Sequence, residues 1–189
     1  MKNISVFCSS SDAIDKLYFE MADELGKLLA NNNFTLVHGG GMIGLMGALS
    51  RSVKKHGGKV IGVIPEKLNK TGIVSTTDDK TVVTADMGER KKYMTYVSDG
   101  FIALPGGFGT LEEILELITL KQLKYHSKPI VIINTNGFYD KLFDLFERLY
   151  SENFAKAEYR DLFFITDSPE KAVEYITGYK YTEIKDKWF

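Results

Sequence analysis

The strongest chemical signal in the chain is the segment LPGGFGTLEEI at positions 104–114. Gly106, Gly107 and Gly109 free the backbone amides from side-chain crowding, and Thr110 adds a hydroxyl where an apolar helical pattern begins. The N-terminus of a helix presents unpaired N–H groups and a partial positive charge, which together favour phosphate. Two glutamates follow at once. The segment therefore predicts a bound phosphate and a carboxylate that acts on the group attached to it.

A second segment, MGERKKYM at positions 87–94, places two cations among methionines. On a helix, Met87, Arg90, Lys91 and Met94 fall on one face. Long cationic side chains can extend from such a face to water, which is one explanation for them. The other is a nearby carboxylate and an anionic ligand, because the planar guanidinium of arginine pairs with either group through two parallel hydrogen bonds.

The glutamates of the first segment also have two explanations. Acidic residues near the start of a helix stabilise it by about 0.3–1 kcal/mol each, which accounts for Glu112 and Glu116 without chemistry. Glu113 is instead the predicted partner of Arg90. If a phosphate lies on the glycine loop, its ribose lies over the start of this helix, and cleavage of an N-glycosidic bond builds positive charge on that sugar. Glu113, kept ionised by Arg90, would stabilise the charge and accept a proton from the attacking water.

A second glycine-rich turn, GGGMIGLMG at positions 39–47, follows the strand-like run FTLVH. Residues 39–44 match G-x-G-x-x-G, a pattern that is weak alone and here follows the second strand rather than the first. The first strand ends in serines, of which Ser9 is a possible phosphate or sugar contact. Tight packing is an alternative explanation for the glycines. Two such turns in one small sheet favour a nucleoside monophosphate or larger phosphate ester, with Gly40 and Gly41 among its contacts.

The segments GGGMIGLMG, MGERKKYM and PGGFGTLEE together resemble the LONELY GUY family of cytokinin riboside 5′-monophosphate phosphoribohydrolases. Many bacterial members of that family carry the label lysine decarboxylase. The resemblance extends from the first strand to about residue 178. It implies a Rossmann-like fold and an N-glycosidase that hydrolyses an adenosine-type nucleoside 5′-monophosphate to free base and ribose 5-phosphate. It also implies a homodimer with active sites at the subunit junction, although some members are hexamers.

Matched residue by residue, the resemblance assigns the essential arginine and glutamate of the family to Arg90 and Glu113, the predicted catalytic pair. It assigns nucleotide-contacting positions to Lys91, Thr119 and residues 107–113. Together with the glycine turns, the predicted substrate- and phosphate-binding residues are Ser9, Gly40, Gly41, Met87, Lys91, Gly106, Gly107, Phe108, Gly109, Thr110, Leu111, Glu112 and Thr119.

A sheet with helices between its strands would bring these segments together. Seven short apolar runs are typical of buried strands: NISVFC, FTLVH, GKVIGVI, KTVVTA, GFIALP, PIVIIN and LFFIT. Helical patterns lie between them, at about 15–31, 44–56, 87–97, 110–125, 138–152 and 168–178. This alternation predicts an α/β fold with a Rossmann-like, doubly wound, mostly parallel sheet of about seven strands, flanked by helices on both faces. In such sheets ligands bind at the carboxyl ends of the strands.

Residues 66–80, EKLNKTGIVSTTDDK, show no clear period. We expect a loop or lid near the carboxyl edge of the sheet, or else a surface excursion without a function. Several plant members of the family have a substrate-contacting glutamate where this chain has Gly72, so the resemblance implies hydrolysis but not a preference for a prenylated adenine.

The helical pattern at 110–125 is apolar on two sides, which is typical of a helix buried on both. One side contacts the core, and the other is either core as well or a contact of a symmetric dimer. The first stripe comprises Leu111, Ile114, Leu115 and Ile118, and Leu117 and Leu120 lie away from it.

The chain of 189 residues predicts a single domain, 1–189, with the tail 179–189 packed over the domain or a neighbour. Its net charge of -1 argues against nucleic acid and anionic membranes as partners. No apolar run approaches the roughly 20 residues of a membrane span, and no secretory signal is expected. The one cysteine, Cys8, excludes an intramolecular disulfide and fits a cytoplasmic location. The three histidines lack ligand-like spacing, so neither a metal nor a cofactor is expected.

Two other functional classes remain open. A non-catalytic carrier or sensor of a phosphorylated ligand, such as the molybdenum cofactor, would use the glycine loops but has no need of the Arg90–Glu113 pair. A dinucleotide-dependent oxidoreductase would explain GGGMIG, yet the first strand lacks the expected fingerprint and no hydride-transfer residues are evident.

Overall fold

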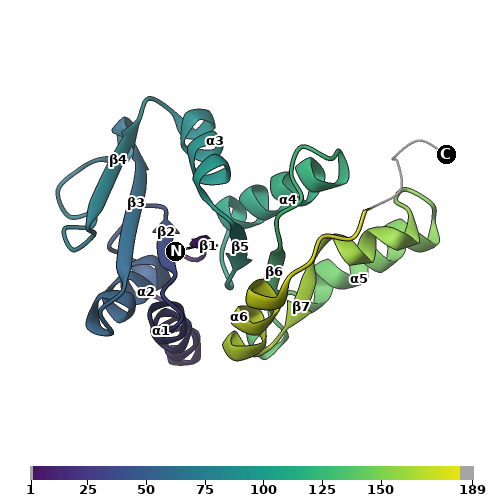
Figure 1. Cartoon of the computed structure of the whole chain (residues 1–189), viewed down its shortest axis with the longest axis horizontal. Helices are drawn as coiled ribbons and strands as arrows, with labels where there is room; N and C mark the ends of the chain where they lie inside the picture. The colour runs from purple at the N-terminus through teal and green to yellow at the C-terminus, as the bar shows by residue number, and fades with distance from the viewer. Residues whose placement is uncertain (1, 184–189) are drawn as a thin grey trace.

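The computed structural model describes residues 2–183, in which seven strands form one sheet (Figure 1). The strand order is β4-β3-β2-β1-β5-β6-β7, and all neighbouring strands run parallel. The direction in which strands are added reverses between β1 and β5, where ligands bind in doubly wound sheets. The strands are β1 (Asn3–Phe7), β2 (Thr35–His38), β3 (Lys59–Pro65), β4 (Lys80–Thr84), β5 (Gly100–Ala103), β6 (Ile130–Ile133) and β7 (Phe164–Thr166).

Helices cover both faces of the sheet, as Figure 1 shows. One hydrophobic cluster joins the sheet to α1, α2 and α6, and the other joins it to α3, α4 and α5. The helices are α1 (Lys16–Asn31), α2 (Gly44–Lys55), α3 (Met87–Val97), α4 (Phe108–Gln122), α5 (Asp140–Ser151) and α6 (Pro169–Gly178). Three short 3₁₀ helices are η1 (Glu66–Leu68), η2 (Thr135–Gly137) and η3 (Ala157–Leu162).

Local sequence explains where several helices begin. Asp15, Asp86 and Ser168 are the N-caps of α1, α3 and α6, and each side chain accepts a hydrogen bond from a backbone amide of the first turn. Helix α4 begins differently, because its N-cap is Gly107 and no described side chain caps it. Its first backbone amides are therefore left for another partner.

The predicted α/β architecture is confirmed, with all seven strands and all six helices in their expected places. Two details of α4 differ. It begins at Phe108 rather than at residue 110, because the extended Gly107 already acts as its N-cap. Burial also divides the first stripe, because Ile114 is 1% exposed whereas Leu115 is 38% exposed, and Leu117, away from that stripe, belongs to the core at 2% exposed.

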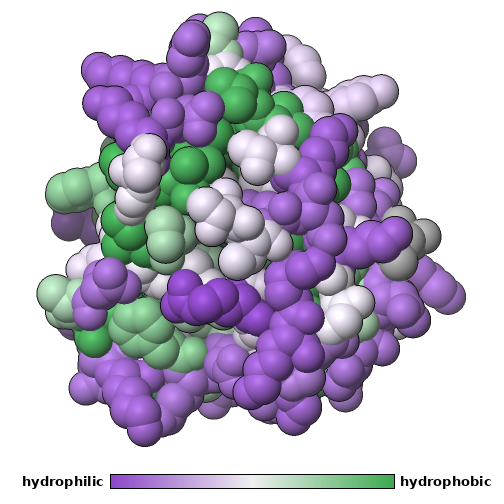
Figure 2. Space-filling view, turned by 90° about the vertical axis from the view of Figure 1, so that its left-hand side faces the viewer, coloured by the Kyte–Doolittle hydropathy of each residue, from purple (hydrophilic) through white to green (hydrophobic). Residues whose placement is uncertain are grey.

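The surface on the β4 side of the molecule groups hydrophobic residues within a hydrophilic border (Figure 2). Leu68 of η1 and Val83 of β4 are among the exposed hydrophobic side chains. At the opposite end of the sheet, the ring of Tyr179 lies 5.6 Å from that of Tyr175. Residues 184–189 of the predicted tail lie outside the described part of the chain. No helix within residues 2–183 is long and apolar enough to cross a membrane.

Candidate active site

The two glycine-rich turns meet beside Ser9, at the carboxyl ends of β1, β2 and β5. The amide of Ser9 donates to the carbonyl of Pro105 (3.1 Å), and the carbonyl of Ser9 accepts from the amide of Leu45 in α2 (3.0 Å). The amide of Gly44 donates to Asp12 Oδ1 (2.9 Å), so the chain after β1 also supports the start of α2. Ser9 thus joins the two turns through its backbone, and its predicted role as a ligand contact stays a prediction.

The glycines of the turn before α4 have different surroundings. A Cβ added at Gly106 would overlap the side chain of Thr110, so Gly106 is required by packing. A Cβ at Gly107 or Gly109 would meet no atom within 4 Å. Nothing in the described protein therefore requires a glycine at these two positions. Open space in front of free helical amides is what an anion needs.

Arg90 and Glu113, from α3 and α4, form a buried ion pair close to this turn. Nη1 of Arg90 donates to Oε1 of Glu113, and Nε of Arg90 donates to the carbonyl of Val63 (3.0 Å). The two residues are 7% and 9% exposed. Gly39 lies against the guanidinium, since a Cβ there would be 2.5 Å from Nη2. The structure therefore brings the predicted catalytic pair together and seats it against the first glycine turn.

Burial raises the pKa of the Glu113 carboxyl above its ordinary value, and the charge and hydrogen bond of Arg90 oppose that rise. The thiol of Cys8 lies nearby. Burial, and then the negative charge of Glu113, raise the pKa of Cys8 far above its usual range. Cys8 is therefore a neutral, buried thiol close to Glu113.

Lys91 forms a second, more exposed link between the same helices. Its ammonium donates to Oε1 of Glu112 and lies 3.1 Å from Oε2 of Glu116. Because α4 begins at Phe108, these glutamates lie beyond its first turn, where the helix dipole acts most strongly. Pairing with Lys91, rather than the dipole, explains their positions.

Known proteins resemble this chain over most of its length. Residues 46–176 match the family described as "Possible lysine decarboxylase". A probable cytokinin riboside 5′-monophosphate phosphoribohydrolase of Oryza sativa subsp. japonica is 42% identical over 178 residues, covering 94% of this chain and 71% of the relative. A cytokinin riboside 5′-monophosphate phosphoribohydrolase of Arabidopsis thaliana is also 42% identical, covering 94% of this chain and 84% of the relative. The chain belongs to the LONELY GUY family.

Solved structures with a fold similar to that of this LONELY GUY protein include molybdenum cofactor carriers. A molybdenum cofactor binding protein from Rippkaea orientalis has a TM-score of 0.72 and 26% identity, over 93% of this chain and 95% of that one. The molybdenum cofactor carrier protein of Chlamydomonas reinhardtii has a TM-score of 0.71 at 23% identity, over 93% and 96% of the two chains, and shows the shared fold.

Several of the predicted substrate-binding residues are exposed or lie away from the ion pair. Met87, the first residue of α3, is 44% exposed, and Phe108, the first of α4, is 92% exposed. Leu111 is partly buried against the α3–α5 cluster. Thr119 is exposed, its hydroxyl donates to the carbonyl of Leu115 (2.8 Å), and it lies about 9 Å along α4 from Glu113. The fold of one copy does not bring Thr119 to the ion pair.

The positions around the first glycine turn of this LONELY GUY protein include two residues that sequence reasoning did not single out. His38 ends β2 directly before the turn, and Asp78 lies in the connection 66–80; the two side chains bond to each other and are fully buried. The signal available in the sequence was an acidic pair in a polar connection, which is also typical of a solvated surface. Gly72, the predicted counterpart of the plant glutamate, has a positive φ of 83° and open space around it.

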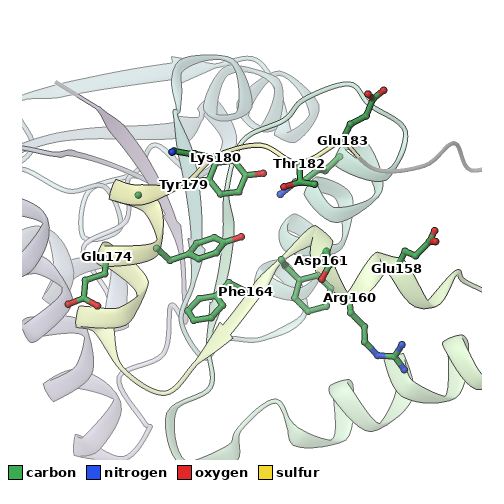
Figure 3. A pocket seen from close by; sticks show the side chains of 13 residues that line it. Glu158, Arg160, Asp161, Phe164, Glu174, Tyr179, Lys180, Thr182 and Glu183 are labelled. Carbon is green, nitrogen blue, oxygen red and sulfur yellow. The ribbon is translucent and has the colours of Figure 1, made fainter.

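Two cavities differ in size and place. A pocket of about 730 Å³ lies between β7, α6 and residues 179–183, and its lining includes Lys121, Phe164, Tyr175 and Tyr179 but not the ion pair (Figure 3). The cavity that touches Glu113 and Lys91 holds only about 10 Å³. A nucleotide cannot fit in that space, so it would lie in the open over the helix start unless another surface covers it. Within residues 2–183, no group of side chains is arranged to hold a metal ion.

Proposed function

We propose that this protein hydrolyses the N-glycosidic bond of an adenine-type nucleoside 5′-monophosphate, such as a cytokinin riboside 5′-monophosphate, to free base and ribose 5-phosphate. The buried Arg90–Glu113 pair beside an uncapped helix N-terminus carries the proposal. Relatives at 42% identity bear the name of this activity. We assign the activity to a single domain, 1–189, and place it in the cytoplasm, because its one cysteine is a buried free thiol.

The phosphate would bind at the first turn of α4, where the amides after Gly107 are free. The ribose then lies over Glu113. As the bond from C1′ to the base nitrogen lengthens, the electron pair leaves with the base and positive charge develops on the sugar. Glu113 stabilises that charge and takes a proton from water, whose oxygen bonds to C1′. The departing base takes up the proton, so water is the only other reactant.

Gly107→Ala tests the phosphate site, because the new methyl group meets no protein atom within 4 Å. We expect the Tm to change by less than a few degrees and the KM for the monophosphate to rise about tenfold, since each 1.4 kcal/mol of lost binding is a factor of ten. Calorimetric titration with ribose 5-phosphate should show the same loss. Gly178→Ala is the matched control, because a Cβ at Gly178 also meets no atom within 4 Å, and this variant should bind ribose 5-phosphate normally. Gly57 is unsuitable, because its positive φ would strain an alanine. An unchanged KM in Gly107→Ala would remove the phosphate from this turn.

The pH dependence of kcat/KM should show the raised pKa of Glu113. The carboxylate must be ionised to accept a proton, so activity falls tenfold per pH unit once the pH drops below that pKa. Because burial raises it, the acidic limb should lie above the ordinary glutamate value of about 4.3. Rates measured between pH 4 and 8, with circular dichroism to confirm folding, test this. An acidic limb with its midpoint at or below the ordinary glutamate pKa would contradict the assignment of this limb to Glu113. So would a limb that persists in Glu113→Gln.

We further propose a homodimer in which a second copy covers the site. Phe108 and Leu115 of α4, and Leu123 directly after it, are exposed, and large apolar side chains on a free surface are typical of an interface. Two antiparallel copies of α4 related by a twofold axis would bring Thr119 of one copy near the helix start of the other. That arrangement would supply the covering surface which the 10 Å³ cavity lacks.

Leu115→Glu should weaken this dimer and reduce turnover together, because Leu115 is 38% exposed on α4 and contributes little to the core. Light scattering coupled to gel filtration should show a shift toward a species of about 21.3 kDa. Leu145→Glu, on an exposed position of α5, is the matched control and should leave mass and rate unchanged. A fully active monomeric Leu115→Glu would show that the site is complete in one copy.

A panel of nucleoside 5′-monophosphates, assayed for released base by chromatography, tests the proposed function directly. Adenine-type monophosphates should release base, and the corresponding nucleosides without phosphate should not. The alternative is a carrier of a phosphorylated ligand, which the fold of the molybdenum cofactor binding proteins favours. Tight binding of a phosphorylated ligand without base release over hours would support the carrier. The Arg90–Glu113 pair and the higher identity to the hydrolases favour the enzyme.

A further inference from the structure

The connection between β3 and β4 packs back onto the first glycine turn. Within residues 66–79, the carbonyl of Ile73 accepts from the amide of Met42 (2.8 Å), and the amide of Ser75 donates to the carbonyl of Gly40 (2.8 Å). These bonds extend the turn as a short antiparallel bridge. The segment that had no assignable period is therefore a wall of the site.

The carboxylate of Asp78 anchors this wall from inside. One oxygen accepts from Ser50 Oγ of α2 (2.8 Å) and from Ser75 Oγ (2.7 Å), and the other lies 2.8 Å from Nε2 of His38. A Cβ at Gly62 of β3 would overlap this carboxylate, so β3 is shaped to admit it. Asp78 thus joins α2, β2, β3 and its own segment at one buried point.

The charge of Asp78 fits an anchoring role. Burial alone would raise the pKa of Asp78, but the hydrogen bonds from His38, Ser75 and Ser50 outweigh that effect and hold it below its ordinary value. The carboxylate is therefore ionised and accepts only, so Nε2 of His38 carries the proton. Nδ1 of His38 is buried and has no hydrogen-bond partner in the described residues. His38 thus depends on Asp78 for its only side-chain hydrogen bond there.

The residue after His38 contacts the catalytic pair. Gly39 lies so close to Arg90 that a Cβ would be 2.5 Å from Nη2. Gly40 packs on β3, where a Cβ would be 2.9 Å from Cβ of Ile64, and Nε of Arg90 donates to the neighbouring Val63 carbonyl (3.0 Å). The glycine turn and β3 together enclose the guanidinium. A shift of His38 would therefore move the glycine turn that packs against the guanidinium.

We propose that Asp78 is a positioning residue: through His38 and the wall at Ser75 it fixes the glycine turn that holds Arg90 against Glu113. The inference rests on the proposed hydrolase function for its kinetic consequences. The claim that Asp78 determines the position of the Arg90 guanidinium does not depend on whether the protein releases base. A displacement near 1 Å at such a pair can cost about a hundredfold in rate.

Asp78→Asn is the test variant, because it keeps the shape of the side chain but removes its charge and replaces one of its two acceptor oxygens by a donor. Asp79→Asn is the matched control. Asp79 belongs to the same segment, but its carboxylate accepts from Lys54 Nζ (2.6 Å) and the amide of Val60 (2.8 Å) rather than from His38. Both variants lose a hydrogen-bonded carboxylate, so both should lower the Tm.

Two measurements separate positioning from simple stabilisation. The first is hydrogen exchange of the Arg90 Nε–H by NMR, which should be at least tenfold faster in Asp78→Asn and unchanged in Asp79→Asn. The second is kcat for base release, which should fall about tenfold or more in Asp78→Asn, with KM within threefold, and stay within twofold in Asp79→Asn. In an Arg90→Lys background, Asp78→Asn should lower kcat no further, because residues that act through one another are non-additive.

Unchanged Arg90 exchange in Asp78→Asn would overturn the proposal, as would an equal loss of kcat in the wild-type and Arg90→Lys backgrounds. A wild-type protein that releases no base but shows the predicted exchange pattern would refute the proposed function and leave the positioning role intact. Normal turnover by the wild type, together with unaltered exchange and kcat in Asp78→Asn, would support the proposed function and refute the positioning role.

Discussion

Glu113→Gln should lower kcat about a thousandfold while the protein still binds ribose 5-phosphate. Glutamine keeps the size of the side chain and can accept the hydrogen bond from Arg90, so the buried guanidinium keeps a partner. It cannot take a proton or offset a developing positive charge. Loss of a general base costs about 10²–10⁴ in rate, and loss of one electrostatic contact about 10²–10³. Single-turnover base release and calorimetric titration measure the two effects separately.

Glu147→Gln is the matched control for this experiment. Glu147 also pairs with an arginine, Arg160, but the pair is exposed on the surface between α5 and η3. Its removal tests whether loss of any Arg–Glu pair affects the rate, and we expect kcat to be unchanged. A Glu113→Gln enzyme that retains more than a tenth of the wild-type kcat would remove Glu113 from the chemical step.

Arg90→Lys should lower kcat/KM about a hundredfold without unfolding the protein. Lysine keeps the positive charge, so Glu113 is not left as a buried unpaired ion. A single ammonium cannot reproduce the fork of donors by which Arg90 reaches both the Glu113 carboxylate and the Val63 carbonyl. The carboxylate should then lose its fixed orientation. Steady-state kinetics and thermal melts of the variant test this expectation.

Arg160→Lys provides the control, because Arg160 makes two hydrogen bonds to Glu147 on the surface. Exposed pairs contribute about 0–1 kcal/mol, so this substitution should alter neither rate nor Tm appreciably. Equal rates for Arg90→Lys and wild type would show that a charge alone is sufficient at position 90. The geometry of the guanidinium would then have no part in catalysis.

The architecture could be read from the sequence because its determinants are local. Runs such as PIVIIN and GFIAL are continuously apolar, as strands buried on both faces must be, and helical periods separate them. Glycine-rich turns at strand ends marked the carboxyl edge of the sheet. The family motif assigned special roles to Arg90 and Glu113, and the fold brings these residues together as a buried ion pair.

Other features of the site were decided only by tertiary contacts. Whether a glutamate on α4 pairs with Arg90 or with Lys91 depends on how α3 lies across that helix. The bond between His38 and Asp78 joins residues 40 positions apart. Local periodicity cannot predict such a contact, because the contact forms only when several separate elements pack around one carboxylate. Sequence thus determined which elements form, whereas the packing of side chains distant in the chain decided which groups share a buried charge.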